Sequence, residues 1–143
     1  MKAKATVICT AILGLAASFG AAAQDPTARC INGLSAEPRL QTIADKVALG
    51  HDDRVFAMRV AADRSPSDRE RAALAVWLDL RNECFSAGEK YRRSVSKPQE
   101  RAFVRSVFVF QQRLVADLRA GRLTYTEYNR RRQELAESAG QEI

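Results

Sequence analysis

The N-terminal segment most constrains the fold, because it determines which residues are left to fold. Lys2 and Lys4 form a short basic region, residues 5–19 are almost all apolar or small, and residues 20–23 are Gly and Ala. This order is typical of a cleavable secretory signal peptide. The apolar run is short for a transmembrane helix, which needs about 20 residues to cross about 30 Å of hydrocarbon. We therefore expect residues 1–23 to be removed during export to a bacterial periplasm or beyond.

Cysteine usage agrees with export. Of the three cysteines, Cys9 lies inside the signal segment, so the mature chain keeps Cys30 and Cys84. Two thiols in an oxidising compartment most simply form one disulfide. A redox-active pair is the alternative, but neither residue belongs to the C-x-x-C motif that activates a thiolate. The sequence therefore predicts a structural bridge between Cys30 and Cys84.

The mature chain, residues 24–143, is long enough for a single domain with a modest core. Apolar residues recur at helical spacing, and no pair of strands or internal repeat is evident. We expect an all-α fold, a small helical bundle of three long helices plus shorter elements, with about residues 36–140 ordered and one disulfide. The first predicted helix covers residues 35–50, and residues 51–64 are expected to form a short helix or turn.

The second predicted helix contains the only tryptophan of the chain. It begins at Ser65, followed by a proline, or at Ser67, which could form a capping box with a glutamate three residues on. The sequence does not decide between these two starts. Trp77 and Cys84 are seven residues apart and share one face, so we expect the disulfide beside a buried indole. Gly88 is expected to end the helix.

Two further helices are predicted in the C-terminal part of the chain. Residues 89–97 are polar and basic and are expected to form a connection. Pro98 opens the third helix, which Gly121 ends as the residue after the C-cap. The last helix has the clearest start, because Thr124 and Glu127 are spaced as a capping box.

A short motif carries a family resemblance. Residues 121–130 read Gly-Arg-Leu-Thr-Tyr-Thr-Glu-Tyr-Asn-Arg, and the chain also has the Trp77–Cys84 helix and an early Cys30. This combination resembles small, uncharacterised secreted helical proteins of Gram-negative bacteria. The resemblance implies a periplasmic helical protein with a disulfide, and it carries no activity. Residues 123–127 are also similar to the Leu-Thr-x-x-Gln helix start of helical periplasmic stress chaperones, with Glu in place of Gln.

No catalytic or metal-binding constellation stands out in the sequence. His51, Asp52 and Asp53 are adjacent, but consecutive residues rarely converge on one ion, and the chain has no second histidine. No serine lies in a nucleophile elbow, and no glycine-rich phosphate loop is present. Carboxylates alternate with arginines at the spacing of a solvated helix face. We therefore expect no catalytic residues, no metal and no cofactor, and a polar turn at His51.

Basic residues are concentrated in the C-terminal part of the chain. Residues 89–143 hold 12 basic and 7 acidic side chains, which favours anionic partners such as phosphorylated lipids, lipopolysaccharide or acidic proteins. Arginine beside tyrosine suits planar or phosphate-bearing partners. The candidate binding surface comprises Tyr91, Arg92, Arg93, Tyr125, Arg130, Arg131 and Arg132. The alternative is a solvated face whose arginine stems cover the edge of the core.

The leading functional hypothesis is a non-enzymatic periplasmic binding or interaction protein that uses this basic C-terminal surface. Its partner would be an anionic envelope component or a periplasmic protein. One alternative is an enzyme with a carboxylate-based site, and another is a chaperone-like or membrane-surface-associated envelope protein. Export argues against nucleic acid as the partner. The apolar stripes look wide enough to cover one another, so we do not expect the mature chain to bind membranes. The sequence does not predict an oligomeric state.

Overall fold

The computed structural model describes residues 25–50 and 63–141, and no strand occurs in these two ranges. The α-helices are α1 (Pro26–Gly33), α3 (Asp68–Ala87), α4 (Glu89–Val95), α5 (Pro98–Arg119) and α6 (Tyr125–Gln141), and the 3₁₀ helices are η1 (Leu34–Ala36) and η2 (Pro38–Leu40). The predicted all-α class is thereby confirmed. The signal segment, the element expected at residues 51–62 and the group around His51 lie outside the described residues.

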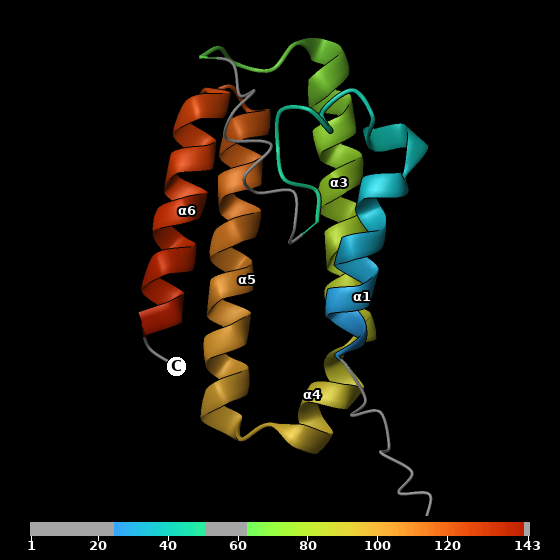
Figure 1. Cartoon of the computed structure of the whole chain (residues 1–143), viewed down its shortest axis with the longest axis vertical. Coiled ribbons are helices and arrows are strands. Elements are labelled where there is room, and N and C mark those ends of the chain that lie inside the picture. The colour runs from blue at the N-terminus through green and yellow to red at the C-terminus, as the bar shows by residue number, and fades with distance from the viewer. Residues whose placement is uncertain (1–24, 51–62, 142–143) are drawn as a thin grey trace, which may run out of the picture.

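Three long helices form the frame of the molecule, as the sequence predicts. Helix α5 runs antiparallel to both α3 and α6, and it packs on each of them (Figure 1). Helix α1 packs along α3. Helix α4 lies at the end of the bundle where α3 leads into α5, and the turn from α5 to α6 lies at the opposite end.

The capping boxes explain where two of the long helices begin. Ser67, and not Ser65, caps α3: the Glu70 amide donates to the Ser67 hydroxyl at 3.4 Å, and the Ser67 amide donates to the Glu70 carboxylate at 2.8 Å. Helix α6 begins in the same way, because the Thr124 amide donates to Glu127 at 2.8 Å and the Glu127 amide donates to the Thr124 hydroxyl at 3.2 Å. The predicted start of the last helix is confirmed.

The turn from α5 to α6 depends on one glycine. Gly121 has a φ of 74°, which glycine adopts without the steric penalty of a Cβ. The Gly121 amide donates to the Leu118 carbonyl at 2.9 Å, and the Arg122 amide donates to the Asp117 carbonyl at 2.9 Å. This pair of bonds is a Schellman motif, so the predicted end of the third helix is confirmed.

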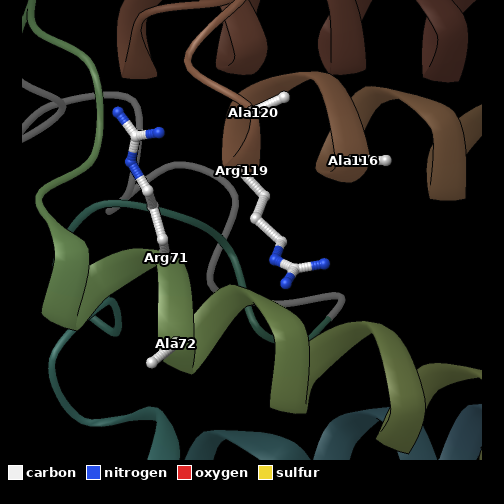
Figure 2. A pocket seen from close by; sticks show the side chains of 5 residues that line it. All are labelled: Arg71, Ala72, Ala116, Arg119 and Ala120. Carbon is white, nitrogen blue, oxygen red and sulfur yellow. The ribbon is translucent and has the colours of Figure 1, made fainter.

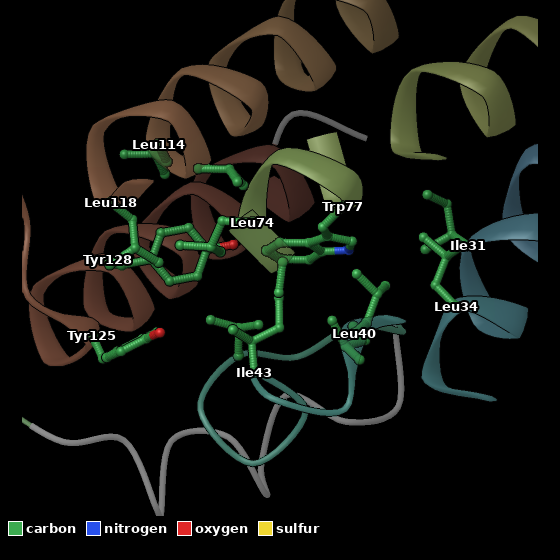
Figure 3. Close-up of a cluster of buried hydrophobic side chains, with 14 of the residues drawn as sticks. Ile31, Leu34, Leu40, Ile43, Leu74, Trp77, Leu114, Leu118, Tyr125 and Tyr128 are labelled. Atoms are coloured by element: carbon green, nitrogen blue, oxygen red, sulfur yellow. The ribbon is translucent and has the colours of Figure 1, made fainter. Parts of the chain in front are cut away.

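The core is built around Trp77 (Figure 3). The indole is fully buried, as predicted, and its ring meets the Tyr128 ring edge-on with centroids 6.4 Å apart. Further fully buried side chains come from the segment after η1, from α3, from α5 and from α6: Leu40, Ile43, Val47, Leu74, Val115, Leu118 and Tyr125. The core therefore joins the three long helices and residues 40–49 into one unit.

Residues 35–50 differ from the predicted helix. They form the short helices η1 and η2, followed by turns over residues 41–46. The amides of Leu40 and Ile43 bond to the carbonyls three residues earlier, which is the 3₁₀ pattern. The prediction of an α-helix was wrong, but Ile43 and Val47 are buried as expected. The Val47 amide donates to the Ile43 carbonyl at 3.1 Å, so this last turn keeps the four-residue spacing of an α-helix.

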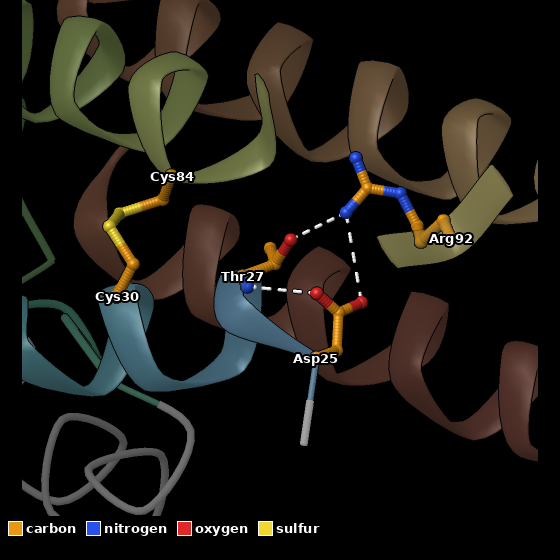
Figure 4. The surroundings of a disulfide bond; sticks show 5 residues. All are labelled: Asp25, Thr27, Cys30, Cys84 and Arg92. Carbon is orange, nitrogen blue, oxygen red and sulfur yellow. Dashed lines mark hydrogen bonds and ion pairs between the residues drawn. A yellow bond between two sulfur atoms is a disulfide. The ribbon is translucent and has the colours of Figure 1, made fainter. Parts of the chain in front are cut away.

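Helix α1 lies before residues 36–140, the range that we expected to be ordered. A disulfide bonds this helix to α3 (Figure 4). Cys30 of α1 is bonded to Cys84 of α3, with a Cα–Cα distance of 5.3 Å. The predicted bridge is therefore confirmed. Asp25 caps α1 by accepting from the Thr27 amide at 2.8 Å, and Pro26 stands in the first turn. A helix this short is marginal in water, so the bridge and the packing on α3 stabilise it.

Residues 89–97 also differ from the prediction. We expected a connection, but residues Glu89–Val95 form the helix α4. Glu89 lies in its first turn and pairs with Arg93 at 2.6 Å across one helical turn. Arg92 anchors the helix to its neighbours, as described below.

Candidate anion-binding pocket

The structure corrects the predicted basic surface at Arg92, which is buried against the start of α1 (Figure 4). Its Nη1 donates to the Thr27 hydroxyl at 2.5 Å and pairs with the Asp25 carboxylate at 3.7 Å, while its Nη2 donates to the carbonyl of Phe85. Gly88 makes room for this contact, since a Cβ there would overlap the Thr27 and Asp25 oxygens. Arg92 therefore connects α1, α3 and α4 and is not available to a partner.

Tyr125 is the second correction, because its side chain is fully buried. The Arg64 guanidinium lies 5.6 Å from the centre of its ring, and burial together with the Glu70 carboxylate raises the pKa of the phenol. Glu70 is itself buried and accepts two bonds of 2.8 Å from Arg64. These three residues fix the start of α6 and leave no face of Tyr125 for a ligand.

The remaining residues of the predicted surface do not form one patch. Tyr91 is half-buried and Arg93 pairs with a glutamate on α4, whereas Arg130 and Arg131 are exposed near the start of α6. Helix α4 and the start of α6 lie at opposite ends of the bundle (Figure 1). Arg130 is paired with Glu134 at 2.9 Å. Arg92 and Arg93 line a hollow of about 240 Å³ that also contains the Glu89 carboxylate, with which Arg93 is paired. Arg132 lines a different pocket, in which no described carboxylate takes part.

A pocket of about 220 Å³, which we call the Arg81 pocket, lies between α1, α3, α5 and α6. Most of its wall is apolar: Ile31, Phe85, Val104, Val107, Phe108 and Ala136. Its described polar lining consists of Thr27, Arg81, Gln111 and Arg132, so these residues contribute two cations and no carboxylate. An apolar pocket with a few convergent polar groups is the usual form of a small-molecule site.

Arg81 of α3 is the central group of this pocket and is only 4% exposed. Its Nη2 donates to the Gln111 side-chain oxygen at 2.6 Å, and its Nε donates to the Gln112 oxygen at 2.9 Å. Gln112 is itself held, because its amide nitrogen donates to the Leu78 carbonyl at 3.2 Å. The guanidinium thus has a fixed position, with Nη1 left without a hydrogen bond to any described residue.

The electrostatic setting of Arg81 is unusual for a buried arginine. No carboxylate among residues 25–50 and 63–141 pairs with it, whereas the buried Arg92 has Asp25. The Trp77 and Phe108 rings lie 5.2 and 5.8 Å from its guanidinium carbon. Burial, with a further contribution from Arg132, lowers its pKa to about 10, so the side chain remains charged at neutral pH.

Arg132 supplies the second cation from α6. Its Nη1 donates to the Ala48 carbonyl at 2.6 Å, which fixes the end of the side chain. No described carboxylate is paired with it. Two positioned cations in an apolar pocket can hold one anion by charge-assisted hydrogen bonds, which are stronger than those between neutral groups. The pocket can therefore bind an anion that carries an apolar group.

Arg81 is absent from the predicted binding surface, although its position in the sequence is unusual. Arg81 lies four residues after Trp77 and three before Cys84, so it occupies the apolar face of its helix, where a charged residue is rare. Gln111 and Gln112 lie 30 and 31 residues further along the chain. Their contact with Arg81 depends on how α3 and α5 pack, which periodicity does not reveal.

A second hollow, of about 360 Å³, lies between α3 and α5 and has arginine and alanine walls (Figure 2). Arg71 of α3 is partly held, because its Nε donates to the Pro66 carbonyl at 3.1 Å. Arg119 of α5 is exposed. Neither arginine is buried, so both remain hydrated, and this hollow is a weaker candidate than the Arg81 pocket.

One expectation about the helix surfaces needs correction. We expected the apolar stripes to cover one another, but large apolar side chains of α5 remain exposed: Val104 and Val109 at 41% and Phe110 at 48%. Val95 of α4 is 60% exposed. Val104 lines the Arg81 pocket, so an exposed apolar side chain of α5 adjoins it, whereas Val109 lies about 140° from Val104 around the helix.

Other kinds of site were sought in the same residues. Within the two described ranges, no three His, Cys, Asp or Glu side chains are grouped so that they could hold a metal ion. None of the helices in those ranges is long and apolar enough to cross a membrane. Comparisons with protein-family models, curated proteins and solved structures give no match to the chain. The resemblance drawn from residues 121–130 therefore stays a prediction.

Proposed function

We propose that this chain is a non-enzymatic binding protein of the bacterial envelope that holds a small apolar anion in the Arg81 pocket. The observation that carries the proposal is Arg81 itself, a buried and positioned cation in an apolar pocket, with no carboxylate partner in residues 25–50 and 63–141. A buried charge is costly unless it is paired. A ligand anion would supply the missing partner.

The partner is still an anionic envelope component, as the charge distribution led us to expect. The site differs from the predicted one, because it is the Arg81 pocket and not the exposed basic surface. Contact would occur in the Arg81 pocket through Arg81 and Arg132, while the excess of basic over acidic side chains in residues 89–143 would attract anions at longer range. Export to the periplasm or beyond is part of the proposal. It is supported by the signal-like residues 1–23 and by the disulfide, which is compatible with an oxidising compartment.

The test is calorimetric titration of the oxidised protein with octanoate, and with 1-octanol and octylammonium as ligands of the same chain without the negative charge. We expect octanoate to bind and the two comparators to bind at least about tenfold more weakly, a difference of about 1.4 kcal/mol. Arg81→Met and Arg132→Gln should weaken octanoate binding.

Arg130→Gln is the matched control, because it removes an arginine of α6 that is exposed and lies outside the pocket. It should leave octanoate affinity unchanged. Equal binding of octanoate and 1-octanol, or equal octanoate binding by the wild type and Arg81→Met, would refute the proposed site.

A further inference from the structure

A second apolar hollow adjoins the Arg81 pocket where α5 faces α6. This α5–α6 groove, of about 280 Å³, is lined by Phe103, Val107, Phe110, Leu135 and Ala139, and its other lining residues are two serines. Val107 lines both hollows. The two hollows are therefore neighbours, one with cations and the other without any charged side chain in its wall.

The volume of the Arg81 pocket limits the size of the anionic ligand that it can enclose. A volume of about 220 Å³ is less than the roughly 300 to 1,000 Å³ of pockets that enclose a drug-sized ligand. The pocket therefore has room for a small anionic head and a short apolar segment. A longer ligand whose head reaches Arg81 has to continue outside the pocket, and the α5–α6 groove adjoins it at Val107.

Two exposed apolar side chains of α5 adjoin the two hollows. Phe110 lines the groove and is 48% exposed, and Val104 lines the Arg81 pocket and is 41% exposed. Exposed apolar side chains next to a lined hollow are typical of a ligand-binding groove. An apolar chain lying there would remove both side chains from water.

Building on the proposed function, we propose that the ligand is a free fatty acid. Its carboxylate pairs with Arg81 and Arg132, and its acyl chain passes Val107 and lies in the α5–α6 groove. A carboxylate is a small, planar anion that matches the hydrogen-bonding edge of a guanidinium, and it leaves the rest of the Arg81 pocket to the first methylenes of the chain. The groove, without charged lining residues, suits only the tail.

Chain length provides the test. The oxidised protein is titrated with octanoate, decanoate, dodecanoate and tetradecanoate, each below its micelle-forming concentration. A buried methylene raises affinity by up to about fourfold, and an open groove gives less. We therefore expect tetradecanoate to bind at least about tenfold more tightly than octanoate.

Two tryptophan variants locate the tail. Ala139→Trp fills the groove at a residue that does not line the Arg81 pocket, and Val109→Trp is the control, because Val109 is exposed on α5 and lines neither hollow. Ala139→Trp should remove the gain from octanoate to tetradecanoate while octanoate still binds. Val109→Trp should keep that gain.

The outcomes separate this inference from the proposed function. If octanoate binds through Arg81 but affinity does not rise with chain length, the fatty-acid inference fails and the anion site stands. If affinity rises equally in Ala139→Trp and Val109→Trp, the tail does not lie in the groove. If octanoate does not bind to the wild type, the proposed function fails as well.

Discussion

Replacing Arg81 with methionine should weaken anion binding without destabilising the protein. A pKa lowered from 12.5 to about 10 means that the folded protein disfavours the charged guanidinium by about 3 kcal/mol relative to water. Methionine keeps most of the stem, removes that charge and packs well against the Trp77 and Phe108 rings. Two hydrogen bonds to glutamines are lost, each worth about 1 kcal/mol.

The balance predicts that Arg81→Met raises the free energy of unfolding by about 1 kcal/mol. Replacing a buried ionic group by an apolar side chain of similar volume is often neutral or stabilising, by roughly 1 to 4 kcal/mol. For a domain of this size the melting temperature should rise by about 3 °C. Urea unfolding followed by circular dichroism, with the disulfide intact, measures the change.

Arg92→Met is the matched control, because Arg92 is also buried but has partners in Asp25, Thr27 and Phe85. Its loss removes the cation beside the partly buried Asp25 carboxylate and the hydrogen bonds to Thr27 and Phe85, and should cost about 2 to 3 kcal/mol. A loss of more than about 2 kcal/mol in Arg81→Met would refute the reasoning, because it would show that Arg81 is a structural cation like Arg92.

Three further predictions concern the frame of the site. Glu70→Gln should lower stability by about 2 kcal/mol at pH 7, since hydrogen bonds from Arg64 and Ser67 lower the Glu70 pKa to about 2 and the partial exposure of Arg64 reduces the gain. Because the folded pKa lies below the unfolded one, the wild type should lose this contribution as pH falls from about 4.5 to about 2, and the variant should not. Acid titration followed by circular dichroism measures this difference. Cys30→Ser with Cys84→Ser should lower the free energy of unfolding by about 4 kcal/mol in the chain-entropy description. The double variant should also weaken octanoate binding, because α1 carries Thr27 and Ile31 of the pocket wall; an unchanged affinity would show that the pocket does not depend on the disulfide. Trp77→Ala should cost about 3 to 5 kcal/mol in urea unfolding, and a change within about 0.5 kcal/mol would contradict the burial of the indole.

The features that could be predicted are those that depend on residues close together in the sequence. The Thr124–Glu127 box, Pro98 at a helix start and Gly121 after a helix end each act within a few residues, and the structure has all three helix boundaries. The Cys30–Cys84 bridge was predicted from the expected oxidising compartment and from the two cysteines left in the mature chain. Helix α1 and helix α4 were missed because eight and seven residues are too few to display a clear period.

The site itself could not be predicted, because it is made by tertiary contacts. A run of arginines on α6 drew attention to Arg130 and Arg131, which the structure leaves exposed. Arg81 is a single arginine on the helix face that carries Trp77 and Cys84, and only the packing of α3 on α5 gives it two glutamines and an apolar pocket. Two residues of the predicted surface, Arg92 and Tyr125, are buried and have structural contacts instead.

The most direct measurement of the central claim is the ionisation of a bound ligand head. Octanoate labelled with ¹³C at the carboxyl carbon is titrated with acid in complex with the oxidised protein and followed by NMR. If Arg81 and Arg132 hold the carboxylate, its pKa in the complex lies below that of free octanoate, because nearby cations favour the charged form. A pKa equal to or above that of free octanoate would show that the carboxylate does not meet these arginines and would contradict the account.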